Sequence, residues 1–120
     1  MAKSGTTDGQ ILKGLLDTLV LDALRDRPNY GFGIRESLGE KLGEDAELVR
    51  EATLYPLLHR LERRGYLASH KEPGSRGTPR KYYRLTADGK RFLDERIREW
   101  HRIAGLVRRV FEVDPTEQGE

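Results

Sequence analysis

The sequence predicts a mainly α-helical domain with a small two-stranded β-ribbon, and three observations lead to this prediction. Apolar residues recur at helical spacing along four segments of the 120-residue chain. Two short segments typical of strands surround a Gly- and Pro-rich loop at 73–79, as in a β-hairpin. The last long segment, 86–113, keeps a heptad spacing of apolar residues over nearly three repeats.

Composition excludes several classes of function. The chain has no cysteine, which rules out disulfides, thiolate metal sites and cysteine nucleophiles and fits a cytoplasmic protein. The hydrophobic content of 36% is low for a compact monomer and favours a core shared with a second chain. No apolar run approaches the length of a membrane span, and the N-terminal residues lack the hydrophobic part of a signal peptide.

Positive charge is concentrated in the middle of the chain. Between Arg50 and Arg84, nine basic residues stand against three acidic ones, a local net charge of +6 in a chain of net charge +2. Such asymmetry is typical of a surface that binds nucleic acid, although a solvated basic face is the alternative interpretation.

The first half of the chain predicts two helices. Residues 1–9 are small and polar, so we expect a flexible N-terminal arm before a domain at 10–85. Segment 10–24 is apolar over more than half of a helix circumference and is expected to be buried against several neighbours. Pro28 ends it. Segment 30–42 predicts a second helix, and 43–45 the turn after it.

The third helix carries apolar residues at positions 54, 57, 58 and 61, on one face, and ends near Gly65. Its start lies between Glu51 and Thr53. If Thr53 is the N-cap, Pro56 loses no intrahelical hydrogen bond; if the helix starts at Glu51, Pro56 removes one bond. Either way Pro56 lies near the end that helix-turn-helix proteins insert into the major groove.

The β-ribbon and the last helix complete the pattern of a winged helix-turn-helix domain. Strands are expected at 66–72 and 80–85, with one tyrosine of Tyr82 and Tyr83 packed inward. The final helix, roughly 40 Å long at its rise per residue, is predicted to dimerise through its heptad seam and to end before a tail at 114–120. The alternative is a helix that lies across its own domain. The seam residues are Leu93, Ile97, Trp100, Ala104, Val107 and Phe111.

Several motifs resemble the PadR-like family of transcriptional regulators. They are Ile11-Leu-Lys-Gly14, Tyr30-Gly-Phe-Gly-Ile34, Thr53-Leu-Tyr-Pro-Leu-Leu58, Leu61-Glu-Arg-Arg-Gly-Tyr-Leu67 and Arg80-Lys-Tyr-Tyr-Arg-Leu-Thr86. The resemblance implies a cytoplasmic repressor that dimerises through a single C-terminal helix, binds an inverted-repeat operator and is often released by a small molecule. One departure is that Val49-Arg50-Glu51 replaces the serine that family members often place before the third helix.

Residues on the exposed side of the third helix and in the wing are candidates for DNA contact. Thr53 and Tyr55 lie nearest the groove-entering end, although Tyr55 can equally be a core tyrosine. A Gly-flanked arginine at the wing tip can enter a minor groove or contact a phosphate, or it is an idle loop charge. The candidate DNA contacts are Thr53, Tyr55, His59, Arg60, Arg63, Arg76, Arg80 and Lys81.

Trp100, the only tryptophan, lies on the heptad seam. Near a two-fold axis, two indoles can leave a slot for a planar aromatic effector, or they can anchor the interface only.

Neither an enzyme nor a metal site is expected, because His59, His70 and His101 lie on different predicted elements and no other ligand set is present. The sequence therefore predicts a homodimeric, sequence-specific DNA-binding regulator without a cofactor. The alternative is a winged-helix interaction module that binds RNA or a protein partner through its basic face.

Overall fold

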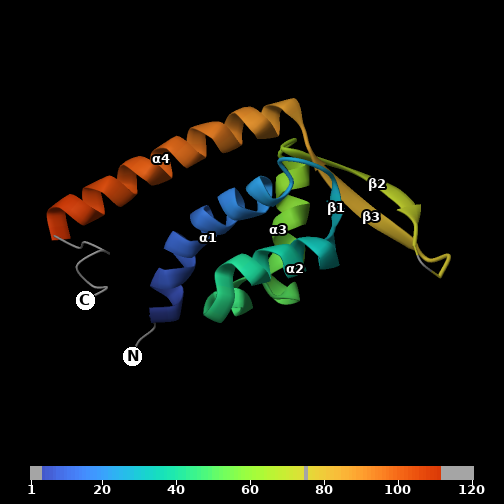
Figure 1. Ribbon diagram of the computed structural model, residues 1–120, viewed down its shortest axis with the longest axis horizontal. Helices are drawn as coiled ribbons and strands as arrows, with labels where there is room; N and C mark the ends of the chain where they lie inside the picture. Colours follow the sequence, from blue (N-terminus) through green and yellow to red (C-terminus); the bar gives the residue numbers. More distant parts are fainter. Residues whose placement is uncertain (1–3, 75, 112–120) are drawn as a thin grey trace.

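The computed structural model describes residues 4–74 and 76–111, with side chains from residue 11 onward. Its helices enclose a core beside a small antiparallel sheet, so the predicted fold class is confirmed (Figure 1). In chain order the elements are α1 (Ser4–Ala23), β1 (Asn29–Tyr30), α2 (Gly31–Leu42), the 3-10 helix η1 (Gly43–Val49), α3 (Glu51–Arg63), β2 (Leu67–Pro73), β3 (Pro79–Leu85) and α4 (Ala87–Phe111).

Two boundaries in the first half differ from those expected. Helix α1 begins at Ser4, so residues 4–9 continue the helix rather than form a separate arm. No proline lies between residue 4 and residue 23 to interrupt it. After α2, the expected turn is instead a 3-10 helix that reaches Val49, and Gly43 allows the change of direction with a φ of 58°.

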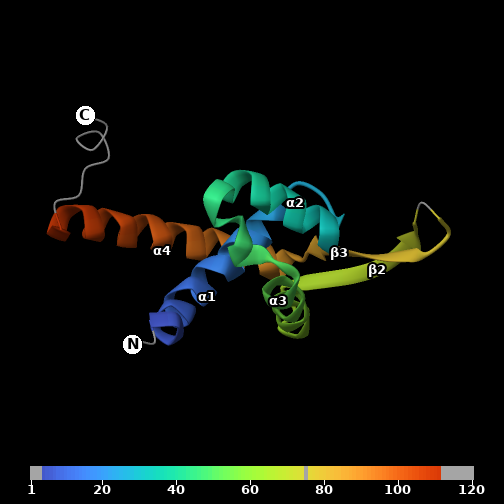
Figure 2. The same cartoon turned by 90° about the horizontal axis from the view of Figure 1, so that it is seen from below.

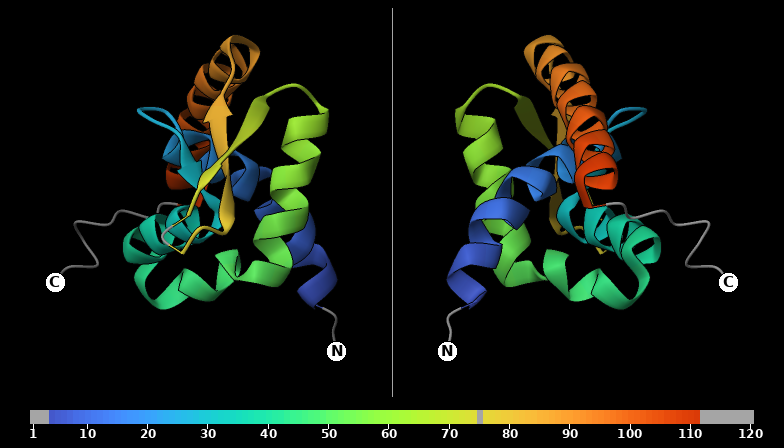
Figure 3. Two further views of the ribbon diagram at one scale, coloured as in Figure 1. Left: turned by 90° about the vertical axis from the view of Figure 1, so that its right-hand side faces the viewer. Right: turned by 90° about the vertical axis from the view of Figure 1, so that its left-hand side faces the viewer.

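The sheet has three strands rather than the two expected, in the order β1-β3-β2. The added strand pairs Asn29 with Tyr83 and Tyr30 with Tyr82, and two residues are too few to show a strand period in the sequence. The hairpin of β2 and β3 forms the wing. Its strands are paired from Leu67 and Leu85 at the base to Pro73 and Pro79 beside the tip. In the view along the long axis, β1 lies toward α2 and β2 toward α3 (Figure 3).

The core is formed by the apolar faces of α1, α2, α3 and α4, by Val49 of η1 and by Leu67 and Tyr83 of the sheet. Tyr83 is the inward tyrosine, with 3% of its surface exposed, whereas Tyr82 covers the opposite face of the ribbon. Burying side chains of this size stabilises the fold by roughly 1.5–3 kcal/mol each. The fully buried residues include Val20, Leu21, Ile34, Val49, Leu54, Leu58, Leu61 and Leu93.

Helix α4 begins on the core and then leaves it. Thr86 caps the helix, since its Oγ1 accepts a hydrogen bond from the Gly89 N–H at 3.0 Å. Figures 1 and 2 show α4 projecting away from the domain on the side opposite the β2–β3 hairpin. The end predicted at Val113 and the tail at 114–120 lie outside the described residues.

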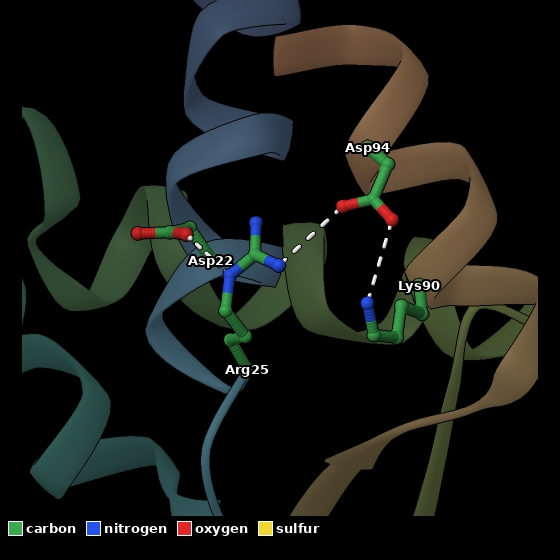
Figure 4. A network of polar contacts seen from close by, with 4 residues as sticks. All are labelled: Asp22, Arg25, Lys90 and Asp94. Atoms are coloured by element: carbon green, nitrogen blue, oxygen red, sulfur yellow. Dashed lines mark hydrogen bonds and ion pairs between the residues drawn. The ribbon is translucent and has the colours of Figure 1, made fainter.

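An ionic network joins the end of α1 to the start of α4. The Arg25 guanidinium lies 3.2 Å from an Asp22 carboxylate oxygen and 3.4 Å from one of Asp94 (Figure 4). Lys90 Nζ lies 3.4 Å from the other Asp94 oxygen. Because all four side chains are partly exposed, the network orients α4 more than it stabilises the fold.

A second ion pair links α1 to α3 and is more deeply placed. Arg60 Nη2 donates to Asp17 Oδ1 at 2.8 Å, with 23% and 12% of the two side chains exposed. Removing one partner from such a pair leaves a poorly solvated charge.

We therefore expect Asp17→Asn to lower the free energy of unfolding by about 2 kcal/mol, less than for a fully buried pair. Urea denaturation at fixed protein concentration measures the change. Lys90→Gln, which breaks an exposed contact with Asp94, serves as the control and should leave the free energy of unfolding unchanged. Equal losses of unfolding free energy in Asp17→Asn and Lys90→Gln would contradict a stabilising role for the ion pair between Arg60 and Asp17.

Candidate nucleic-acid interface

The start of α3 is resolved at Glu51, with Arg50 as the N-cap residue in extended geometry and no side-chain cap. The N–H groups of Thr53 and Leu54 both donate to the Arg50 carbonyl at 2.9 Å. Pro56 therefore lies inside the helix and forgoes one backbone hydrogen bond. Glu51 occupies the first turn, where a carboxylate is favoured by the helix dipole.

Tyr55 is both packed and accessible. Its ring lies against the backbone of Gly31, where an added Cβ would overlap the ring. The side chain remains 37% exposed. The glycine that opens α2 thus permits α2 and α3 to approach closely at the Tyr55 ring. Tyr55 is therefore not a buried core residue, and its contact with DNA stays a prediction.

The remaining α3 candidates divide between two faces. Thr53, His59 and Arg63 are exposed to solvent. Arg60 turns toward α1 and is engaged by Asp17, so its guanidinium braces two helices instead of joining the other candidates. Sequence spacing did not show this, because Asp17 lies 43 positions away.

The wing places its three cations in different surroundings. Arg76 is exposed in the loop that Gly77 turns with a φ of 79°. The Arg80 guanidinium lies over the Tyr30 ring, 4.4 Å from its centre. Lys81 points to the opposite face of β3, with Nζ 3.4 Å from Glu62 Oε1. Arg80 and Lys81 therefore have intramolecular partners, whereas Arg76 has no ion-pair partner among the side chains of residues 11–74 and 76–111.

A row of rings crosses the sheet on the face that bears Arg80. Tyr30, Tyr82 and His70 are in register on the three strands, with ring centres 5.4 Å and 5.8 Å apart. Phe32 extends the row toward α2 at 6.3 Å from Tyr30. Such cross-strand contacts stiffen a sheet. Sequence reasoning missed this row because β1 was not foreseen.

The opposite face of the wing is anchored to α3 through Glu62. The Ser69 hydroxyl donates to Glu62 Oε2 at 2.6 Å, and this hydrogen bond is the main reason that the pKa of Glu62 lies below its ordinary value of 4.5. Lys81 lowers the pKa further, while partial burial opposes both effects. The contacts fix the angle between the hairpin and α3.

The predicted heptad seam divides at the middle of α4. Leu93 is fully buried in the core of its own domain and Ile97 packs against that core, so Leu93 offers no surface to a second chain. Trp100 is partly buried, and its indole N–H donates to Thr18 Oγ1 of α1 at 3.1 Å. Beyond it the apolar side chains are exposed: Ile103, Leu106, Val107, Val110 and Phe111, joined by Ile11 of α1.

In the part of the chain that the structure describes, no three side chains of His, Cys, Asp or Glu are grouped as a metal site. Within the same ranges, no helix is both long and apolar enough to cross a membrane.

Comparison with known proteins agrees with this geometry. The family model described as "Transcriptional regulator PadR-like family" matches residues 20–95. A PadR family transcriptional regulator from Eggerthella lenta is 36% identical, with a TM-score of 0.75 over 92% of this chain and 94% of that one. A PadR-like transcriptional regulator from Bacillus cereus is 28% identical, with a TM-score of 0.73 over 88% and 99% of the two chains. An uncharacterised protein of Lysinibacillus sphaericus is 31% identical over 81% of this chain and 88% of its own.

The Ser69 contact leads to a pH-dependent prediction. A carboxylate whose pKa is lowered in the folded state stabilises the fold above its unfolded pKa, and this contribution is lost as the pH falls through the folded value. Ser69→Ala should therefore lower the free energy of unfolding near neutral pH, and the difference from the natural protein should shrink below pH 4.5. Urea denaturation across this range measures it. Ser37→Ala is the control, and its free energy of unfolding should differ from that of the natural protein by an amount that does not vary with pH. A pH-independent difference for Ser69→Ala would refute the Ser69 hydrogen bond as the cause of the lowered Glu62 pKa.

Proposed function

The chain belongs to the PadR-like family of transcriptional regulators, and from this premise we propose that it is a homodimeric cytoplasmic repressor that binds an inverted-repeat operator and responds to a small ligand. The observation that carries the proposal is the start of α3, where Thr53, Tyr55 and His59 are all exposed to solvent. Membership in this family places the chain among DNA-binding regulators of transcription rather than enzymes.

The proposed DNA contacts fall into two groups. Thr53, Tyr55, His59 and Arg63 belong to the recognition helix, where the N-terminal turns reach base edges and the later residues reach phosphates. Arg76 extends from the wing tip toward the adjacent groove or backbone. Arg80 is held by the Tyr30 ring, and Lys81 by Glu62, so these cations add positive potential from fixed positions. Arg60 acts indirectly by holding α3 on α1.

The proposed dimer uses the exposed half of α4. The apolar side chains after Trp100 include proposed interface residues Val107 and Phe111, which are 42% and 68% exposed in the single chain. Ala104 lies on the same exposed half of the helix. Pairing of such surfaces across a two-fold axis would place two recognition helices about one DNA turn apart. The centres of the two operator half-sites would then be separated by about 10 bp.

Selection from a random DNA library tests this function. We expect enrichment of one inverted repeat, with affinity that falls steeply as salt rises. Arg76→Gln should weaken binding and reduce the salt slope by about 1, because one phosphate contact is lost. Arg98→Gln, on an exposed face of α4, should change neither quantity.

Sequence-blind binding or no binding to DNA would refute the proposal. Either result would favour the alternative of an interaction module whose basic face binds RNA or a protein partner. Binding of the same surface to single-stranded or structured RNA, with no preference for a DNA repeat, would identify that alternative.

The effector we propose for the Trp100 region is a planar aromatic molecule. The indole already donates to Thr18 with one edge, which leaves its partly exposed ring to form one wall of a slot near the two-fold axis. A planar aromatic dye should therefore quench Trp100 fluorescence in a saturable way. A flat titration would remove this effector site and leave Trp100 as an anchor of the interface.

A further inference from the structure

A hollow lies between α1, η1 and α3, elements that can be followed in Figure 2. Its volume is about 460 Å³, within the range of small-molecule sites. Its walls are mainly apolar. Leu16 and Leu57 form the floor as members of the core, with 6% and 4% of their surfaces exposed. The other apolar lining residues are Leu12, Leu48 and Pro56.

The rim of the hollow is cationic. Lys13, Arg50 and Arg60 line it together with a single carboxylate, that of Glu47. Asp17 already neutralises Arg60 at 2.8 Å. For Lys13 and Arg50, by contrast, no ion-pair partner is present among the side chains of residues 11–74 and 76–111. With Arg60 neutralised by Asp17, Lys13 and Arg50 outweigh the Glu47 carboxylate by one positive charge, so this apolar cavity is complementary to a molecule with an apolar body and one anionic group.

The position of Arg50 connects this hollow to the recognition helix. The Arg50 carbonyl accepts the first hydrogen bonds of α3, and its side chain is free of any capping role. Thr53, a proposed operator contact, also lines the hollow. An anion bound here would share Arg50 and Thr53 with an approaching DNA phosphate, so that ligand and operator would weaken each other's binding by the same factor.

We propose that the hollow between α1, η1 and α3 is a binding site for an amphipathic organic acid, with its anionic group at Lys13 and Arg50 and its apolar body against Leu12, Leu48 and Leu57. The proposal deepens the ligand response and rests on the proposed function for its regulatory effect. It is separate from the Trp100 slot, because Gly14 and Thr18, the α1 residues beside the indole, are absent from its lining.

A matched pair of fluorescent probes tests the site on the full chain without DNA. Anilinonaphthalenesulfonate has the anionic group, and phenylnaphthylamine has the same rings without it. We expect Arg50→Gln to weaken binding of the sulfonate about tenfold, the effect of losing a charge-assisted hydrogen bond, and to leave binding of the neutral probe nearly unchanged. Leu12→Asp should weaken both probes, whereas Arg98→Gln, on an exposed face of α4, should weaken neither.

Three results would overturn the site. They are equal effects of Arg50→Gln on the two probes, loss of binding only in Trp100→Phe, and conversion of the dimer to a monomer by Leu12→Asp. The last result would mean that a second chain covers the hollow. Circular dichroism establishes that each variant is folded. If Leu12→Asp does not fold, the Arg50→Gln variant is sufficient by itself to test the proposal.

A second measurement separates this site from the proposed function. The sulfonate probe should lower the affinity of the natural chain for its selected repeat and should have no such effect on Leu12→Asp. If no repeat is selected but the probe pattern holds, the site stands and the repressor function fails. If a repeat is selected but the probe affects its binding equally in both proteins, the regulatory role of the hollow is refuted.

Discussion

The packing of α3 into the core is the constraint on which the rest of the structure depends. Leu54, Leu58 and Leu61 are fully buried on one face of the helix. Because these residues span two turns, they fix the rotation of α3 about its axis as well as its position. The opposite face must then carry Tyr55, His59 and Arg63 to the surface. A rotation of the helix would expose leucines, each at a cost of roughly 1.5–3 kcal/mol, and the direction of the proposed recognition surface is therefore set by hydrophobic burial.

Polar contacts then decide what the basic residues around α3 do. The sequence places nine of them between Arg50 and Arg84, and charge alone makes them equivalent. In the folded chain Arg60 is bound to Asp17, Lys81 to Glu62, and Arg80 to the Tyr30 ring. These three brace the recognition helix and the wing against their neighbours. Arg63 and Arg76 remain exposed to solvent, and they are the cations that we propose to contact a polyanion.

Helix α4 serves two environments in succession. Its first half belongs to the domain, since Leu93 is buried and Trp100 donates to Thr18. Its second half carries apolar side chains away from the domain, where Val110 and Phe111 are about two-thirds exposed. The low hydrophobic content of the chain is consistent with this division, because a small core is completed early and the remaining apolar surface suits a second copy. The same helix thus links the DNA-binding domain to the proposed two-fold axis.

The sequence by itself determined the helices, the hairpin and the apolar faces, because periodicity along the chain encodes which side of each element avoids water. The spacing of Leu54, Leu58 and Leu61 predicted the buried face of α3, and the family motifs pointed to a regulator of transcription. Only the tertiary structure decided the partner of each face. In the folded chain β1 is a third strand of the sheet, Leu93 is buried in the core of its own domain, and Arg60 forms an ion pair with Asp17. The physical reason is that a local pattern fixes burial, whereas the neighbour that provides it comes from residues far apart in the sequence, which only the packed fold brings together.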